Sequence, residues 1–90
     1  MRLDLYLAER GQQTRLASLI DAQPQLVWQW IKGARDVPAD RCPDIERATD
    51  GVVSCEEMRP DVPWLRVTDA AWHWHPNGRP VIDVSARLPA

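Results

Sequence analysis

Two glutamine side chains, Gln25 and Gln29, offer the most specific chemistry in this sequence. They stand four positions apart, and Trp28 and Lys32 fall at the same helical spacing, so all four would lie on one side of a helix. The other side would be apolar, with Leu26, Val27, Trp30 and Ile31. A glutamine amide both donates and accepts hydrogen bonds, which lets it pair with the edge of an adenine in the major groove of DNA. The pattern predicts a helix that packs by its apolar side and reads base edges with Gln25 and Gln29.

The segment before this helix must hold it in place. A short helix is predicted from Gln13 to about Ile20, and residues 21–23 separate it from Pro24, which suits the first turn of the next helix. Gly33 is placed to end that second helix after Lys32. So short a connection is typical of a helix-turn-helix, although small helical domains that bind no nucleic acid carry amphipathic helices too. The candidate contacts to DNA phosphates are Gln13, Thr14, Lys32 and Arg35.

The remainder of the chain predicts three more helices and a β-hairpin. The helices cover about Arg2–Arg10, about Ala39–Thr49 and a short segment after Ser54, where the Ser-x-x-Glu spacing is that of a capping box. Residues 61–69, which include a proline, are predicted to form a linker. Alternating residues at 71–75 and 81–88 flank a turn signal at 76–79 and predict the hairpin. The expected fold is mainly α, with a helical domain at residues 1–62 and a linker and hairpin at residues 63–90.

Several stretches of the sequence resemble a known family. Gln13-Thr14-x-Leu16-Ala17, followed by Val27 and Gly33, resembles the helix-turn-helix of phage Cro and CI repressors. Residues 22–33, 37–49 and 55–61 resemble, more narrowly, the YdaS-type, Cro-like family, and the likeness covers residues 3–64. The resemblance implies a Cro/CI-like five-helix domain that binds double-stranded operator DNA. By position it implies base contacts from Gln25, Trp28 and Gln29 and backbone contacts from Gln13 and Arg35.

Three positions depart from this family's pattern. Asp21 stands where such repressors often have glycine, and aspartate tolerates the left-handed backbone conformation better than most residues. Gln23 stands where the family often has serine, and glutamine is a poorer helix N-cap. Trp28 replaces a small polar residue, and its ring would pack either on a thymine methyl group or against protein.

The charge is unevenly distributed along the 90 residues. The net charge of −2 and the pI near 5.6 disfavour a nucleic-acid-binding protein, which is usually basic. Residues 10–35, however, carry four basic side chains and one acidic, whereas residues 36–61 carry eight acidic and three basic. A positive segment therefore coincides with the predicted helix-turn-helix, and the total charge does not exclude DNA.

The sequence offers no constellation for catalysis, and we expect neither enzymatic activity nor a cofactor. Cys42 and Cys55 lack CxxC spacing and are predicted to be small buried apolar residues. His73 and His75 would share one face of a strand and form a possible metal pair. Strand alternation, with Trp72 and Trp74 inward and the histidines outward, explains them more simply, so no metal site is expected.

The hairpin is predicted to need a partner surface, because a two-stranded hairpin is marginally stable alone. We expect it to contribute to a homodimer, since operator recognition usually places two recognition helices on one duplex. The residues assigned to dimerisation are Trp72, Trp74, Ile82 and Val84. An alternative is an antitoxin or anti-repressor that acts mainly through contacts with a toxin or another protein. The N-terminus lacks signal-peptide features and no segment is long enough to span a membrane, so a cytoplasmic protein is expected.

Overall fold

The computed structural model describes residues 1–83 of the chain. Within that range the chain forms helices, one 3₁₀ turn and a pair of antiparallel strands, which confirms the predicted mainly α fold with a hairpin. The elements in order are α1 (Leu3–Tyr6), α2 (Gln12–Leu19), α3 (Pro24–Lys32), the 3₁₀ turn η1 (Ala39–Arg41), α4 (Cys42–Ala48), α5 (Cys55–Met58), β1 (Trp64–Val67) and β2 (Arg79–Ile82). No helix among these is long and apolar enough to cross a membrane.

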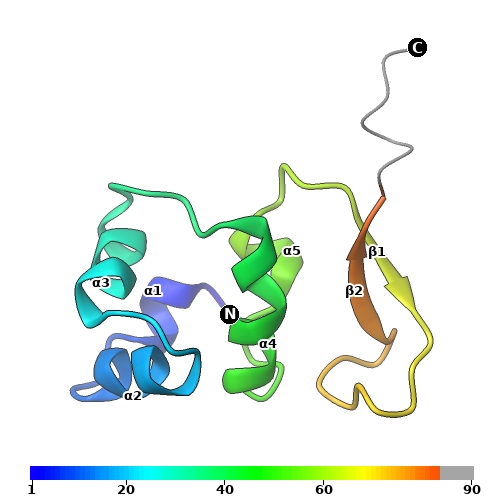
Figure 1. Cartoon of the computed structure of the whole chain (residues 1–90), viewed down its shortest axis with the longest axis horizontal. Helices are drawn as coiled ribbons and strands as arrows, with labels where there is room; N and C mark the ends of the chain where they lie inside the picture. Colours follow the sequence, from blue (N-terminus) through cyan, green and yellow to red (C-terminus); the bar gives the residue numbers. More distant parts are fainter. Residues whose placement is uncertain (84–90) are drawn as a thin grey trace.

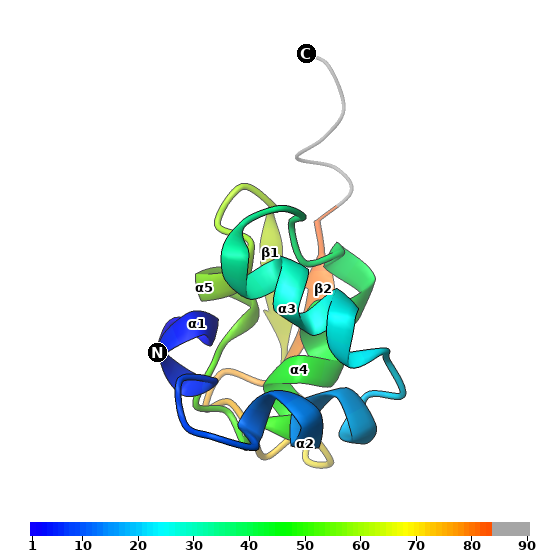
Figure 2. The ribbon, with the colours of Figure 1, turned by 90° about the vertical axis from the view of Figure 1, so that its left-hand side faces the viewer.

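The elements are arranged in three groups along the longest dimension of the molecule (Figure 1). Helices α1, α2 and α3 lie at one end, α4 and α5 occupy the middle, and the β1–β2 sheet lies at the other end. Figure 2, turned by 90°, shows α2 and α3 in front of α4, with the sheet behind them. Helices α2 and α3 and the sheet therefore lie on opposite sides of α4 and α5.

The core lies between the helices and draws one or more apolar side chains from each of them. Fully enclosed members have less than 1% exposure, and they are Val27, Cys42, Ile45, Val53 and Cys55. Trp64 of β1 packs against the edge of this core. The two cysteines are free thiols and buried, which confirms the prediction made for them. Burial raises the pKa of the Cys42 thiol to about 12 and raises the pKa of the Cys55 thiol as well.

Each of the three longest helices ends in the same local motif. At the end of α2, the Ala22 N–H donates to the Ala17 carbonyl at 2.9 Å, and Asp21 has a positive φ of 55°. These features define a Schellman motif in which aspartate replaces the usual glycine. Gly33 plays this role after α3, with φ of 74°, and Asp50 after α4, with φ of 56°. The expectation that Asp21 would adopt the left-handed conformation is confirmed.

The predicted boundaries of the helices were accurate for α2 and α3 and less accurate for the first and fourth predicted helices. Helix α3 has the predicted bounds, and α2 begins one residue early. The first helix, predicted to reach Arg10, stops at Tyr6. The helix predicted at Ala39–Thr49 is divided at Cys42, because Pro43 has no N–H to donate to the Ala39 carbonyl. The capping box of α5 is confirmed, with reciprocal bonds between Ser54 and Glu57.

The first strand of the hairpin was wrongly predicted. Strand β1 is Trp64–Val67, inside the predicted linker, and it pairs with β2 so that Trp64 faces Ile82 and Val67 faces Arg79. Residues 71–75 belong to the connection between the strands. Their alternation resembles a strand, but the indole of Trp72 bonds to Glu46, and its ring meets that of Trp74 edge to face at 4.8 Å. Of the second predicted strand, 81–88, residues 84–88 lie outside the described range.

Candidate nucleic-acid interface

Helices α2 and α3 pack closely because the residues between them are small or apolar. Leu16 and Ala17 of α2 are buried, and so are Val27 and Trp30 of α3. Ala17 is 1% exposed, and its single methyl group lets the two helix backbones approach. The connection of four residues, 20–23, turns the chain from one helix into the other. The structure thus confirms two short helices that are joined by a short connection and packed against each other.

The outer face of α3 carries the predicted polar side chains. Gln25 and Lys32 are exposed, Gln29 is half-buried, and Trp28 is 48% exposed. The Lys32 ammonium lies 5.8 Å from the centre of the Trp28 ring, a cation–π contact within the same face. Leu26 and Ile31 pack against the core beside Val27 and Trp30, as predicted. The amphipathic division of α3 is confirmed.

A shallow depression joins the end of α3 to its outer face. Its lining comprises Gln23, Gln25, Leu26, Gln29 and Arg35. The chain folds back after Gly33, because the N–H groups of Ala34 and Arg35 both donate to the Gln29 carbonyl, at 3.0 and 3.3 Å. This return places the Arg35 side chain beside the two glutamines. The structure thus brings together two predicted base-reading residues and one predicted phosphate-binding residue.

The other two predicted phosphate contacts lie at the start of α2. Gln13 and Thr14 are in its first turn, and Thr14 is exposed while Gln13 is half-buried. Gly11, with φ of 88°, precedes them and offers no capping side chain. Backbone N–H groups of this turn are therefore left without a side-chain cap.

Four cations that are near α2 and α3 in the sequence form no ion pair within residues 1–83. They are Arg10, Arg15, Lys32 and Arg35, all within the segment that runs from the end of α1 to just beyond α3. Five other described arginines form ion pairs with Asp or Glu: Arg2, Arg47, Arg59, Arg66 and Arg79. Arg41 forms no ion pair there either, and its guanidinium donates to the Ile20 carbonyl. The described cations without an ion pair therefore all fall within residues 10–41, the segment that contains α2 and α3.

The acidic residues of α4 and α5 are engaged elsewhere, with Glu46 at the centre. This carboxylate is fully buried and accepts hydrogen bonds from Arg66, the Cys55 N–H and the Trp72 indole. Burial by itself would raise the pKa of Glu46, but these donors outweigh it and hold the pKa below its usual value. Part of the acidic excess of the sequence is thus internal and does not face the helix-turn-helix.

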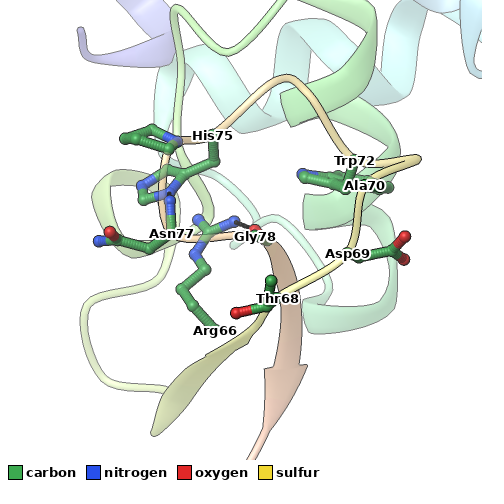
Figure 3. Close-up of a pocket in the computed structure, with 9 residues that line it drawn as sticks. Arg66, Thr68, Asp69, Ala70, Trp72, His75, Asn77 and Gly78 are labelled. Carbon is green, nitrogen blue, oxygen red and sulfur yellow. Dashed lines mark hydrogen bonds between the residues drawn. The ribbon is translucent and has the colours of Figure 1, made fainter.

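A hollow inside the β1–β2 connection also carries polar side chains (Figure 3). Arg66 lies at its floor, with Trp72 on one side and His75 and Asn77 on the other. All five guanidinium N–H groups of Arg66 are used, by Glu46, Glu56 and the Gly78 carbonyl. Since no donor of Arg66 remains for an anion, we assign the hollow a structural role.

The histidines of the connection do not form the strand pair that was considered for a metal. His75 accepts a hydrogen bond from the Asn77 N–H through Nδ1, and His73 packs on Trp74 with ring centres 4.2 Å apart. No cluster of three or more potential metal ligands occurs in the part of the chain that the structure describes.

Of the residues assigned to dimerisation, Trp72, Trp74 and Ile82 are half-buried, and Val84 lies outside the described residues. The exposed apolar side chains of the sheet are instead Leu65 and Val67, at 49% and 42% exposure. Both belong to β1, which the sequence pattern did not reveal as a strand because Pro63 precedes it.

A known family matches most of this chain. Residues 3–67, from α1 through β1, match the family model described as bacterial toxin YdaS. The chain belongs to the YdaS family. It is also 57% identical over 54 residues to a protein of Escherichia coli strain K12 described as a putative transcriptional regulator, YdaS. That alignment covers 60% of this chain and 55% of the relative, so the chain spans about half the length of the curated relative it matches. No solved structure gives a significant match. The YdaS family match includes the helix-turn-helix, the buried Glu46 and Arg66, which pairs with it.

Proposed function

We propose that the chain is a sequence-specific regulator of transcription, a Cro-like repressor that inserts α3 into the major groove of double-stranded DNA. The relative described as a transcriptional regulator aligns with 60% of the chain and supports a regulatory role. In this account the protein acts by binding alone and performs no catalysis.

The observation that carries the proposal is the outer face of α3. Gln25 and Gln29 project from a helix whose opposite side is locked into the core by Val27 and Trp30. A rigid helix holds such amides in a fixed position, which direct readout of bases requires. Arg35 lies beside them in the same depression, where a phosphate of the groove wall would meet it.

Trp28 occupies the centre of this face and is assigned a DNA contact. Its ring is half exposed, and the Lys32 ammonium lies beside it. The two side chains together offer an apolar ring and a positive charge. A thymine methyl group would pack on the ring, and a nearby phosphate would pair with the ammonium. Gln13 and Thr14 are assigned to the backbone through the first turn of α2.

A direct test is to select bound duplexes from a random pool and to measure affinity for the selected duplex and a scrambled one by fluorescence anisotropy. The proposal expects a preference of at least about 10³ for the selected duplex, with affinity that falls as salt rises. If the pool shows no enrichment, or if the two duplexes bind equally, the proposal is wrong.

We propose further that two copies pair on DNA through the outer face of the sheet, where Leu65 and Val67 are exposed. The sheet and α3 lie on opposite sides of α4 and α5 (Figure 1), and the molecule is 43 Å long. Pairing through the sheet would therefore place the two recognition helices at the far ends, more than one helical turn of DNA apart. Half-sites one turn apart in the selected duplex would contradict this arrangement.

A second candidate function is recognition of a protein partner, as an antitoxin or anti-repressor. The exposed Leu65, Val67 and Trp28 favour it, because large exposed apolar side chains mark interaction surfaces. Neutralisation of Arg35 separates the two candidates. It weakens DNA binding in the first and leaves partner binding by the sheet unchanged in the second.

A further inference from the structure

Two arginines outside α2 and α3 donate hydrogen bonds to main-chain carbonyls, one before α3 and one after it. Arg41, at the end of η1, donates from Nη1 to the Ile20 carbonyl at 2.8 Å. Arg59, just after α5, donates from Nη1 to the Val37 carbonyl at 2.9 Å. Ile20 precedes the turn into α3, and Val37 ends the loop that leaves it. Each bond spans more than 20 residues of sequence, so each ties the reading helix to the α4–α5 layer.

The bond from Arg41 meets a carbonyl that the helix itself cannot satisfy. The last carbonyls of an α-helix have no intrahelical partner, and the Schellman motif of α2 uses those of Ala17 and Ser18. The Ile20 carbonyl follows them and accepts from the guanidinium. A cation is favoured at this end of a helix by the helix dipole. Arg41 therefore fixes the peptide at which the chain turns toward α3.

The Arg59 guanidinium is also bound by a neighbouring carboxylate. Its Nε and Nη2 donate to the two oxygens of Asp61, at 2.9 and 2.8 Å, which is a bidentate pair. The pair leaves Nη1 directed at the Val37 carbonyl. Because Val37 is buried and lies two residues after Arg35, the contact also anchors the loop that presents Arg35.

We propose that Arg41 and Arg59 are positioning residues, which set the orientation of α3 against α2 and of Arg35 against the two glutamines. The inference rests on the proposed function, since its consequence is selectivity for DNA sequence. Neither side chain lines the depression on the outer face of α3. Their replacement is therefore expected to lower discrimination between sequences more than affinity for DNA in general.

The experiment compares the full-length chain with Arg41→Gln, Arg59→Gln and a matched control, Arg47→Gln. Arg47 is an arginine of α4 whose one ion pair with the residues that the structure describes is the exposed pair with Asp44. Backbone amide hydrogen exchange is measured first, without DNA. Arg41→Gln is expected to speed exchange at Ala22 by about tenfold or more, and Arg59→Gln at Ala34 and Arg35. Arg47→Gln is expected to leave all three amides unchanged.

The selected and scrambled duplexes then report on selectivity. Both positioning variants are expected to reduce the ratio of the two affinities by about tenfold, with the affinity for the scrambled duplex within about twofold of the original. Arg41→Lys and Arg59→Lys retain a cation near each carbonyl and are expected to recover part of the ratio. They also provide folded variants if a glutamine variant does not fold.

The outcomes separate the two proposals. If the original chain binds both duplexes equally, the proposed function fails, and selectivity set by these arginines fails with it. If the original chain is selective and the glutamine variants keep its full selectivity and its exchange rates, the positioning proposal alone is overturned. Equal losses for the selected and scrambled duplexes would also overturn it, since they would indicate a general loss of folded protein or of charge.

Discussion

Glu46 of α4 and Arg66 of β1 form a bidentate ion pair inside the molecule, with Nη–Oε distances of 2.6 and 2.8 Å. The glutamate side chain is fully buried and the arginine side chain is 8% exposed. The Cys55 N–H and the Trp72 indole donate to the same carboxylate. One buried charge thus connects α4, α5, β1 and the β1–β2 connection, which makes the hairpin part of the same packed unit as the helices.

Removal of Arg66 is expected to destabilise the whole chain. Arg66→Met leaves the buried Glu46 charge without its cation, and such a change typically costs about 3–5 kcal/mol. Urea unfolding followed by circular dichroism measures the loss. The control is Arg79→Met, whose pair with Asp69 is exposed and is expected to contribute less than about 1 kcal/mol. Similar losses for the two variants would contradict the central role of Glu46.

The same pair bears on the predicted division of the chain at residue 62. A chain truncated there would lose Arg66 and Trp72 while keeping Glu46 in the α4–α5 interface. We therefore expect residues 1–62 to unfold at a lower urea concentration than the full chain by a margin at least as large as that of Arg66→Met. A truncated chain as stable as the full one would show that the helices need no hairpin.

The same cluster determines how the unfolding free energy is expected to change at acidic pH. Hydrogen bonds from Arg66 lower the pKa of Glu56, and despite burial the pKa of Glu46 is lowered as well, from an ordinary value of 4.5. The unfolded chain therefore binds protons more readily than the folded one. Their contribution to stability is present above about pH 4.5 and is lost as the pH falls through the lowered values.

Replacement of Glu46 and Glu56 by glutamine is expected to flatten the dependence of the unfolding free energy on pH between about 5 and 3. Urea titrations at a series of pH values measure it, with Glu9→Gln, an exposed carboxylate outside the cluster, as the control. An unchanged slope in the double variant would rule out these carboxylates as the source of the acid lability.

The β1–β2 connection packs closely against Gly51, just after the end of α4. A Cβ atom at this position would lie 1.9 Å from the Trp74 carbonyl oxygen, and φ is 79°. At Gly33, φ is 74° but nothing lies within 4 Å of the added atom. Gly33→Ala therefore reports the backbone strain alone, about 1–2 kcal/mol. Gly51→Ala is expected to cost at least about 1 kcal/mol more in thermal unfolding, because main chain must move. Equal costs would indicate that Trp74 does not pack there.

Helices α2 and α3 were predictable from local signals, and the first strand of the hairpin was not. Pro24 and Gly33 bound α3 by their own backbone preferences, and the spacing of Val27 and Trp30 identified the buried face without knowledge of the fold. Strand β1, by contrast, depends on contacts far along the chain. Trp64 packs on the helical core and Arg66 pairs with Glu46, 20 residues away. The spacing of residues in the sequence reveals neither contact. The strand was therefore predicted at the alternating Trp-His-Trp-His segment instead.

The candidate site, too, was predictable only in part. The types and positions of Gln25, Gln29 and Arg35 predicted an interface, and the structure brings these three into one depression. The contributions of Arg41 and Arg59 were not predicted. Their partners are main-chain carbonyls, which every residue possesses, so the sequence gives no indication of which carbonyl an arginine will reach.

Charge neutralisation at the interface is expected to change the salt dependence of binding. Arg35→Gln should weaken binding to all duplexes similarly and reduce the slope of log affinity against log salt by about one. Arg47→Gln is the control, because Arg47 belongs to α4, already pairs with Asp44 and does not line the depression that holds Arg35. A salt slope that is unaltered by Arg35→Gln would remove Arg35 from the phosphate contacts.

The amides on the outer face of α3 are proposed to read bases, and Gln29→Ala removes one of them. Affinities for the selected duplex and for duplexes altered at each single base pair are measured with the original chain and the variant. Gln29→Ala is expected to lose about 1–3 kcal/mol of binding free energy on the selected duplex and to become indifferent to the base at one position, while discrimination at the other positions is kept. If Gln29→Ala and the equivalent Gln25→Ala retain the full base preference of the original chain at every position, α3 is not the reading helix.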